Sequence, residues 1–138
     1  MHVVICGAGV IGTSIAYFLS LRGVEVTVVE RASVACAASG KSGGFLALDW
    51  CDGSPLAPLA RRSFELHGAL AGDLGDDWGY RRLDTFSLLA SDNRDLAGYR
   101  QLQTPDWLGA ETAIHGQLGT EASTAQVHPG DFTKAMMR

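Results

Sequence analysis

Three glycines and one glutamate carry the strongest chemical signal in this sequence. Gly7, Gly9 and Gly12 directly follow the apolar residues 2–6, and Glu30 closes the next apolar run. Glycines at this spacing, between a strand and a helix, are typical of a turn that binds a pyrophosphate, and the later acidic residue suits a ribose. The pattern predicts dinucleotide binding. It disfavours a cofactor with a 2′-phosphate, because the Glu30 carboxylate would repel that group.

Each glycine has a physical reason to stand where it does. Gly7 allows the tight turn out of the strand, Gly9 leaves room for the pyrophosphate, and Gly12 lets the helix pack close to the strand. The predicted cofactor-binding turn also includes the intervening residues Ala8, Val10 and Ile11. Free N–H groups at the start of the helix, together with the helix dipole, favour phosphate there. The alternative is that the glycines serve packing alone and that Glu30 is a solvated strand end.

Two strands and a helix must hold these residues in place. The β-branched residues in 2–6 and 24–29 predict two buried strands, and between them a helix is expected to end at Arg22, before Gly23. Apolar residues at helical spacing are expected to pack this helix on the sheet; they are Ile11, Ile15, Phe18 and Leu19. The order strand, helix, strand predicts an α/β fold that begins as a Rossmann-like domain.

Composition narrows the class of protein. The chain has 138 residues, 46% of them hydrophobic, which suits a globular core. A net charge of −4 argues against a nucleic-acid partner. No apolar run is long enough for a transmembrane segment and no signal sequence precedes the first strand, so we expect a cytoplasmic location. Cys6, Cys36 and Cys51 lack metal-ligand spacing, so no metal site is predicted.

The rest of the chain predicts further elements without an internal repeat. Residues 32–44 form a loop rich in Ala, Ser and Gly. Ser54 and Pro55 suit the N-cap and first turn of an amphipathic helix, whose apolar face includes Leu59 and Leu70. Three more elements are expected: a strand over 82–90, a short helix within 92–103, and a helix over 132–137 after a turn at 128–131.

Three segments together carry a resemblance to a known family. They are Val3 to Arg31, the loop Ala38-Ser39-x-x-Ser42-Gly43-Gly44, and the later stretch Gln126-Val127-His128-Pro129-x-x-Phe132-Thr133. In this order they resemble the FAD-dependent oxidoreductases of the D-amino-acid oxidase and glycine oxidase family, and most of all a poorly characterised eukaryotic branch of it. The resemblance implies an FAD-binding fold of the glutathione-reductase type.

The same resemblance implies a role for each cofactor residue. Gly7, Gly9 and Gly12 would hold the pyrophosphate of FAD, Glu30 the adenosine ribose, and Arg31 would lie on the adenine side. Ala38, Ser39 and Ser42 would line the phosphate and ribityl path, while Gly43, Gly44 and Phe45 would approach the isoalloxazine ring. The implied substrate is a small amine or amino acid, whose C–N bond is oxidised by hydride transfer to the flavin.

No catalytic acid or base is assigned from the sequence. His128 precedes a proline and is more typical of a turn, and His67 reads as a structural or exposed residue of the amphipathic helix. The arginine pairs at 61–62 and 81–82 could bind a substrate carboxylate, although paired arginines are usually solvated. The sequence names neither the substrate nor a covalent attachment point for the flavin.

The expected domain organisation is incomplete. Residues 1–50 are expected to form the N-terminal part of the FAD-binding domain, and residues 51–138 a helix and part of a substrate region. A doubly wound sheet needs more parallel strands than the two predicted here, so we expect a truncated form with weak or no activity alone. Two alternatives stay open. One is a non-catalytic dinucleotide-binding or interaction fragment that associates through its exposed sheet edge. The other is an NAD-linked dehydrogenase domain, which the loop at 39–44 disfavours.

Overall fold

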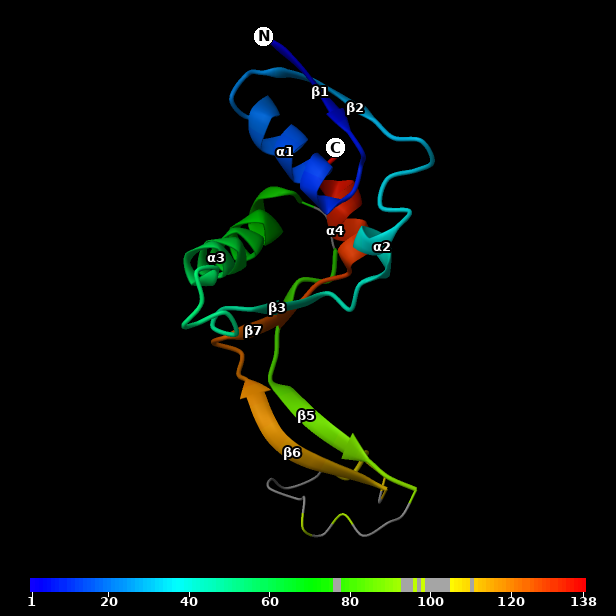
Figure 1. Cartoon of the computed structure of the whole chain (residues 1–138), viewed down its shortest axis with the longest axis vertical. Coiled ribbons are helices and arrows are strands. Elements are labelled where there is room, and N and C mark those ends of the chain that lie inside the picture. The colour runs from blue at the N-terminus through cyan, green and yellow to red at the C-terminus, as the bar shows by residue number, and fades with distance from the viewer. Residues whose placement is uncertain (76–77, 93–95, 97, 99–104, 110) are drawn as a thin grey trace.

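The computed structural model describes residues 1–75, 78–92, 96, 98, 105–109 and 111–138. The element order is β1 (His2–Cys6), α1 (Val10–Ser20), β2 (Glu25–Val29), α2 (Ala38–Lys41), β3 (Phe45–Ala47), α3 (Ala57–Asp73), β4 (Arg81–Arg82), β5 (Thr85–Ala90), β6 (Thr112–Gly119), β7 (Thr124–Gln126) and α4 (Pro129–Ala135). Figure 1 shows an elongated molecule, with β1, β2 and α1 at one end, the β5–β6 hairpin at the other, and α3 and the β3–β7 pair between them.

The N-terminal elements β1, α1 and β2 form a strand–helix–strand unit. β1 and β2 pair in parallel, with His2 opposite Glu25 and Cys6 opposite Val29. Parallel neighbours need a crossover connection, which α1 provides. The two strands form a sheet of their own among the described residues. The predicted α/β start is therefore confirmed, with both strands where the β-branched residues place them. The expectation that these strands are buried is wrong: exposed and half-buried residues alternate along both, and Val4 and Val29 are more than half exposed.

A small antiparallel sheet joins three distant parts of the sequence. β7 lies between β3 and β4, so that Gln126 is opposite both Phe45 and Arg81. The Arg81 guanidinium donates a hydrogen bond to the Gln126 side-chain oxygen. This sheet fixes the end of the small-residue loop against a strand that lies far along the chain, and α4 follows directly.

The core lies beneath α1, where α3 and α4 meet. Its buried residues are Leu70, Trp78, Val127, Phe132, Ala135 and Met136, with Val10, Tyr17 and Phe18 of α1 packed against them. The Phe132 ring lies 4.9 Å from the Trp78 ring, centroid to centroid, and is 4% exposed. Burial of these aromatic groups connects the strand–helix–strand unit to the rest of the molecule.

Two expected helix starts are wrong. The helix after Pro55 begins at Ala57, and Ser54 does not cap it; its hydroxyl accepts the Leu56 N–H in the preceding turn at 3.2 Å. The turn expected at 128–131 is the first turn of α4, which begins at Pro129. His128 is the N-cap residue, and its Nδ1 accepts the backbone N–H of Asp131 at 3.2 Å, so a proline in the first helical position is accommodated.

The strand expected over 82–90 is divided between two sheets. β4 ends at Arg82 and pairs with β7, whereas β5 begins at Thr85 and pairs with β6. Asp84 accepts a hydrogen bond from the backbone N–H of Glu121 at 3.2 Å, in the break between the two strands. The short helix expected within 92–103 lies largely outside the described residues.

The outward face of α1 also differs from expectation. Its buried residues are Thr13 and Ala16, whereas Ile11 is 74% exposed and Ile15 is 46% exposed. The expectation that Ile11 and Ile15 pack on the sheet is wrong, because the buried side of α1 is formed by the smaller residues Thr13 and Ala16. No helix in the described ranges is long and apolar enough to span a membrane.

Candidate dinucleotide-binding site

The glycine turn between β1 and α1 is shaped by close backbone contacts. Gly7 has a φ of +102°, which L side chains rarely adopt, and its N–H donates to the Val29 carbonyl at 2.7 Å. A Cβ at Gly12 would lie 2.0 Å from the Gly7 carbonyl oxygen, so only glycine allows α1 to start this close to the strand. Gly9 differs, since it has an extended backbone with a φ of −80°, and a Cβ there would meet only the Ser39 hydroxyl, at 3.1 Å.

Glu30 links the end of β2 to the glycine turn. One carboxylate oxygen accepts the Ala8 N–H at 2.9 Å, and the other accepts the Ala32 N–H at 3.0 Å. These bonds, the one from Ala8 first, hold the pKa of Glu30 below its usual range. The group is therefore ionised at neutral pH. Each oxygen keeps a lone pair for another donor, such as a ribose hydroxyl. Arg31, beside it, is exposed.

Ser39 connects the small-residue loop to the start of α1. Its hydroxyl oxygen accepts the Val10 N–H at 2.9 Å, and so satisfies one of the amides that the first helical turn leaves without an internal partner. A second contact, from the Ala35 N–H to the Ala8 carbonyl at 3.0 Å, holds the same loop on the turn. The neighbouring Ala38 is exposed.

The loop continues into β3 through two glycines held by β7. The Val127 N–H donates to the Gly44 carbonyl at 3.0 Å, and the Gln126 side-chain amide donates to the Gly43 carbonyl at 3.3 Å. Gly44 has a φ of +72°, and a Cβ there would lie 2.1 Å from the Val127 carbonyl oxygen. Phe45, in contrast, is 58% exposed, so its ring is available to a ligand.

A cavity of about 520 Å³ joins these pieces, and we name it the loop cavity. Its lining includes Val10, Ser39, Ser42, Gly43, Gly44, Phe45, Leu46, Ser63, His67, Val127, Pro129, Phe132 and Thr133. Six residues predicted to bind the cofactor line this cavity: Val10, Ser39, Ser42, Gly43, Gly44 and Phe45. The others do not line it: Gly7, Ala8, Gly9, Ile11, Gly12, Glu30, Arg31 and Ala38.

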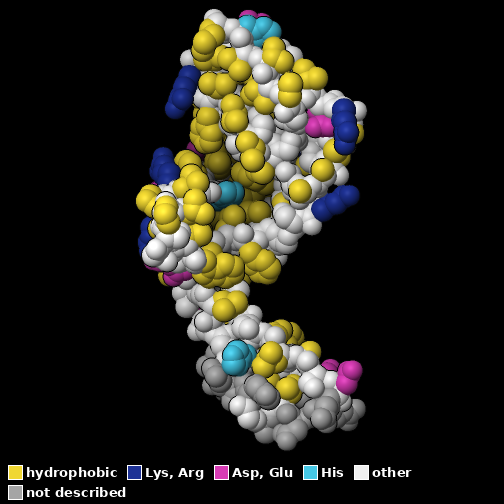
Figure 2. All heavy atoms as spheres, in the orientation of Figure 1, with side chains coloured by type: hydrophobic (Ala, Val, Ile, Leu, Met, Phe, Trp, Pro, Cys, Tyr) yellow, Lys and Arg dark blue, Asp and Glu magenta, His cyan; other side chains and the backbone are white. Residues whose placement is uncertain are grey.

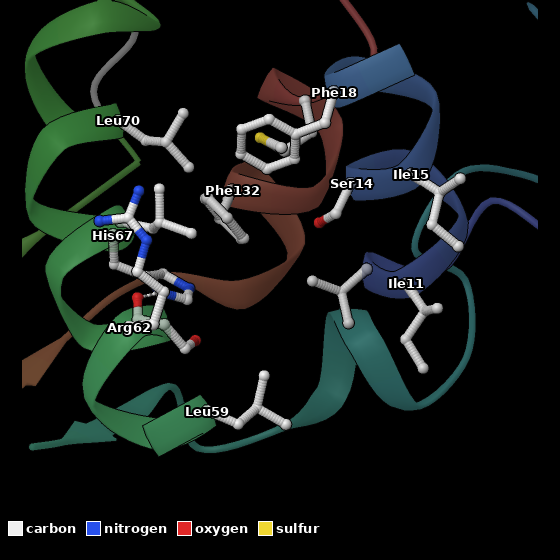
Figure 3. Close-up of a pocket in the computed structure, with 13 residues that line it drawn as sticks. Ile11, Ser14, Ile15, Phe18, Leu59, Arg62, His67, Leu70 and Phe132 are labelled. Carbon is white, nitrogen blue, oxygen red and sulfur yellow. Dashed lines mark hydrogen bonds between the residues drawn. The ribbon is translucent and has the colours of Figure 1, made fainter. Parts of the chain in front are cut away.

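A second cavity of about 400 Å³ lies between α1, α3 and α4, and we name it the helix cavity. Figure 2 shows hydrophobic side chains around this hollow. Its lining includes Ile11, Ser14, Ile15 and Phe18 of α1, and Leu59, Arg62, His67 and Leu70 of α3. In Figure 3, Ser14 and Phe18 lie on the side of α1 that faces α3, whereas Ile11 and Ile15 lie at its outer edge. Phe132, from α4, lines both cavities.

His67 is the residue of this region that sequence reasoning missed. It lines both cavities, its ring lies 4.7 Å from the Phe132 ring, and its Nδ1 lies 2.8 Å from the Ser63 carbonyl oxygen. Burial lowers its pKa, and the bond to Ser63 only partly opposes that shift. The sequence pattern that could have predicted this position is its spacing. His67 follows Leu59 and Ser63 at intervals of four residues, so the three residues share the inward face of α3.

The residues present fit a dinucleotide cofactor. A tight glycine turn opens onto a helix N-terminus, an ionised carboxylate stands at the end of the second strand, and a loop of small residues continues the site. Together these features define the first half-site of a Rossmann-like dinucleotide-binding domain.

Comparison with known proteins specifies the family. Residues 2–138 match the profile of the family described as "FAD dependent oxidoreductase", and the chain belongs to that family. A "Putative oxidoreductase" of Schizosaccharomyces pombe is 35% identical over 98% of this chain and 37% of its own length. A D-amino acid dehydrogenase of Xylella fastidiosa is 41% identical over 56% of this chain and 19% of its own length.

Solved structures agree with the fold. The crystal structure of glycine oxidase from Bacillus cereus matches 97% of this chain with a TM-score of 0.73 and 28% sequence identity. The match covers 43% of that enzyme. The chain thus spans less than half the length of these relatives, and it corresponds to part of their fold.

Proposed function

We propose that this chain binds FAD and forms part of the cofactor site of an amine or amino-acid oxidoreductase. The glycine turn at residues 7–12 would bind the pyrophosphate, and Glu30 the adenosine ribose, with Arg31 on the adenine side. Ala38, Ser39 and Ser42 would follow the phosphate and ribityl path, leaving the segment 43–45 beside the flavin ring.

One cavity lined by both the start of α1 and the small-residue loop is the observation that carries this proposal. The cavity is lined by Val10, in the first turn of α1, and by Ser39, Ser42 and Phe45 of the following loop. Gly7, Gly9, Gly12 and Glu30 are not part of this lining. A dinucleotide is an extended molecule, and its binding elements must lie along one path. Family membership over residues 2–138 supports FAD rather than NAD as the occupant.

The substrate class is proposed from the named relatives. Glycine oxidase and D-amino acid dehydrogenase both take their names from amino acids. Bound FAD supplies the acceptor for a hydride from the carbon that carries the amine. The residues of this chain bind and orient the cofactor, and the apolar side chains of the loop cavity exclude water from it. We further propose that turnover by these 138 residues alone is weak or absent, because they match only 37% of the S. pombe relative.

The test is an FAD titration of the purified chain and of its Gly9→Ala variant. Alanine is allowed by the extended backbone at this position, but its methyl group occupies the approach to the phosphates. We expect FAD affinity to fall at least about tenfold, or about 1.4 kcal/mol. The unfolding midpoint should fall no further than in Ser39→Ala, because the added methyl group meets only the Ser39 hydroxyl, at 3.1 Å. Gly72→Ala is the matched control, since it lies in α3 with nothing within 4 Å of its added methyl group.

Two results would overturn the proposal. One is the absence of FAD binding by the folded wild-type chain, read from flavin fluorescence and from flavin absorbance in the protein peak of a size-exclusion column. The other is tighter binding of NAD than of FAD, which would support the alternative of an NAD-linked dehydrogenase domain.

A further inference from the structure

His67 places a polar group at the point where the loop cavity and the helix cavity meet. It shares this position with Val10, Ser63 and Phe132, which also line both cavities. In Figure 3 the His67 ring projects from α3 toward the space between α3 and α4. Any ligand that extends from Ser39 through the loop cavity toward α3 approaches this ring.

The local contacts decide which nitrogen can receive a hydrogen bond. The Ser63 carbonyl is an acceptor only, so His67 Nδ1, at 2.8 Å from it, carries the proton. In the neutral ring Nε2 is then an acceptor. Its surroundings favour the neutral ring, because apolar side chains of α1 and α4 line the same space.

We propose that Nε2 of His67 accepts a hydrogen bond from the flavin half of bound FAD and positions it in the loop cavity. The donor is an O–H of the ribityl chain or the ring N–H of the isoalloxazine. The inference rests on the proposed FAD binding. It adds a contact from α3, an element to which the proposed function assigns no cofactor residue. His67 is a positioning residue in this proposal, with no part in proton transfer.

The experiment compares two substitutions at one position. His67→Phe keeps an aromatic ring on Phe132 but removes both nitrogens, whereas His67→Gln keeps a side-chain oxygen near the place of Nε2. FAD and ADP are titrated into the folded wild-type chain and both variants, with flavin fluorescence for FAD and calorimetry for ADP. Lumiflavin, which lacks the ribityl chain, separates the two donors. His115→Phe is the matched control, because His115 is exposed in β6.

The expected pattern is specific to the flavin half. His67→Phe should weaken FAD binding about three- to tenfold, the loss of one net hydrogen bond, and leave ADP binding unchanged. His67→Gln should restore FAD binding to within about twofold of wild type. A loss that persists with lumiflavin assigns the ring N–H as the donor, and a loss seen only with FAD assigns the ribityl chain.

The inference and the proposed function fail in different ways. If the wild-type chain binds FAD and His67→Phe binds it equally well, the role of His67 is wrong and the FAD proposal stands. The role of His67 is also wrong if His67→Phe weakens FAD and ADP alike, because that pattern reports a general change in the site. If the wild-type chain binds no FAD, both are overturned.

Discussion

The Glu30 carboxylate accepts a hydrogen bond from the backbone N–H of Ala8 at 2.9 Å, across 22 positions of sequence. This contact ties the end of β2 to the turn that follows β1. The acidic residue therefore holds the shape of the glycine turn, in addition to the ribose contact proposed for it. If the proposed ribose contact forms, ligand binding and local stability are coupled through this one side chain.

The Glu30 contact predicts a defined pH dependence of stability. Because its pKa is lowered in the folded chain, its stabilising effect is fully present above the usual carboxyl range and is lost as pH falls through the lowered value. We expect wild type to be more stable than Glu30→Gln at neutral pH and the difference to shrink on acidification. Urea unfolding between about pH 7 and about pH 3 measures it. Glu25→Gln, which replaces an exposed carboxylate of the same strand, is the matched control. A difference between wild type and Glu30→Gln that stays constant with pH would contradict the prediction.

Ser39 should stabilise the start of α1. Removing its hydroxyl leaves the Val10 N–H without this acceptor, so Ser39→Ala is expected to cost about 1 kcal/mol of unfolding free energy, as for a lost helix cap. Thermal or urea unfolding measures the change. Ser20→Ala removes an exposed hydroxyl at the other end of α1 and should change stability by less than about 0.5 kcal/mol. Equal effects of the two substitutions would exclude a special role for Ser39.

Gly44 should tolerate no side chain. Its left-handed backbone costs an L residue about 1–2 kcal/mol, and the overlap with the Val127 carbonyl adds to that cost. We expect Gly44→Ala to lower the unfolding midpoint and to displace the loop from β7. Gly72→Ala should instead stabilise α3 by up to about 1 kcal/mol, because alanine is the better helix former. The prediction is wrong if Gly44→Ala is as stable as wild type.

Phe132 should be a main support of the core. Phe132→Ala removes a ring that is 4% exposed and contacts both His67 and Trp78, so we expect a loss of about 3–5 kcal/mol. Phe86→Ala, in β5 and 39% exposed, should cost about 1 kcal/mol. Denaturant unfolding compares the two variants, and a similar small loss in both would show that α4 is not part of the core.

The sequence by itself determined the strand–helix–strand unit and the family. Both depend on local features: β-branched runs form the strands, glycines permit the tight turn, and the turn and the acidic residue belong to one short segment. The ribose and phosphate roles of Glu30, Gly7, Gly9 and Gly12 remain predictions that ligand titration will test.

Tertiary structure alone decided how that segment is completed. β7 holds Gly43 and Gly44, and His67 reaches the boundary of the two cavities. Each of these facts depends on contacts between residues that are far apart in sequence, which local pattern does not encode. Ile11 is a second example of what the sequence does not determine. Its helical spacing predicts an apolar face, but the burial of that face depends on which elements lie beside it.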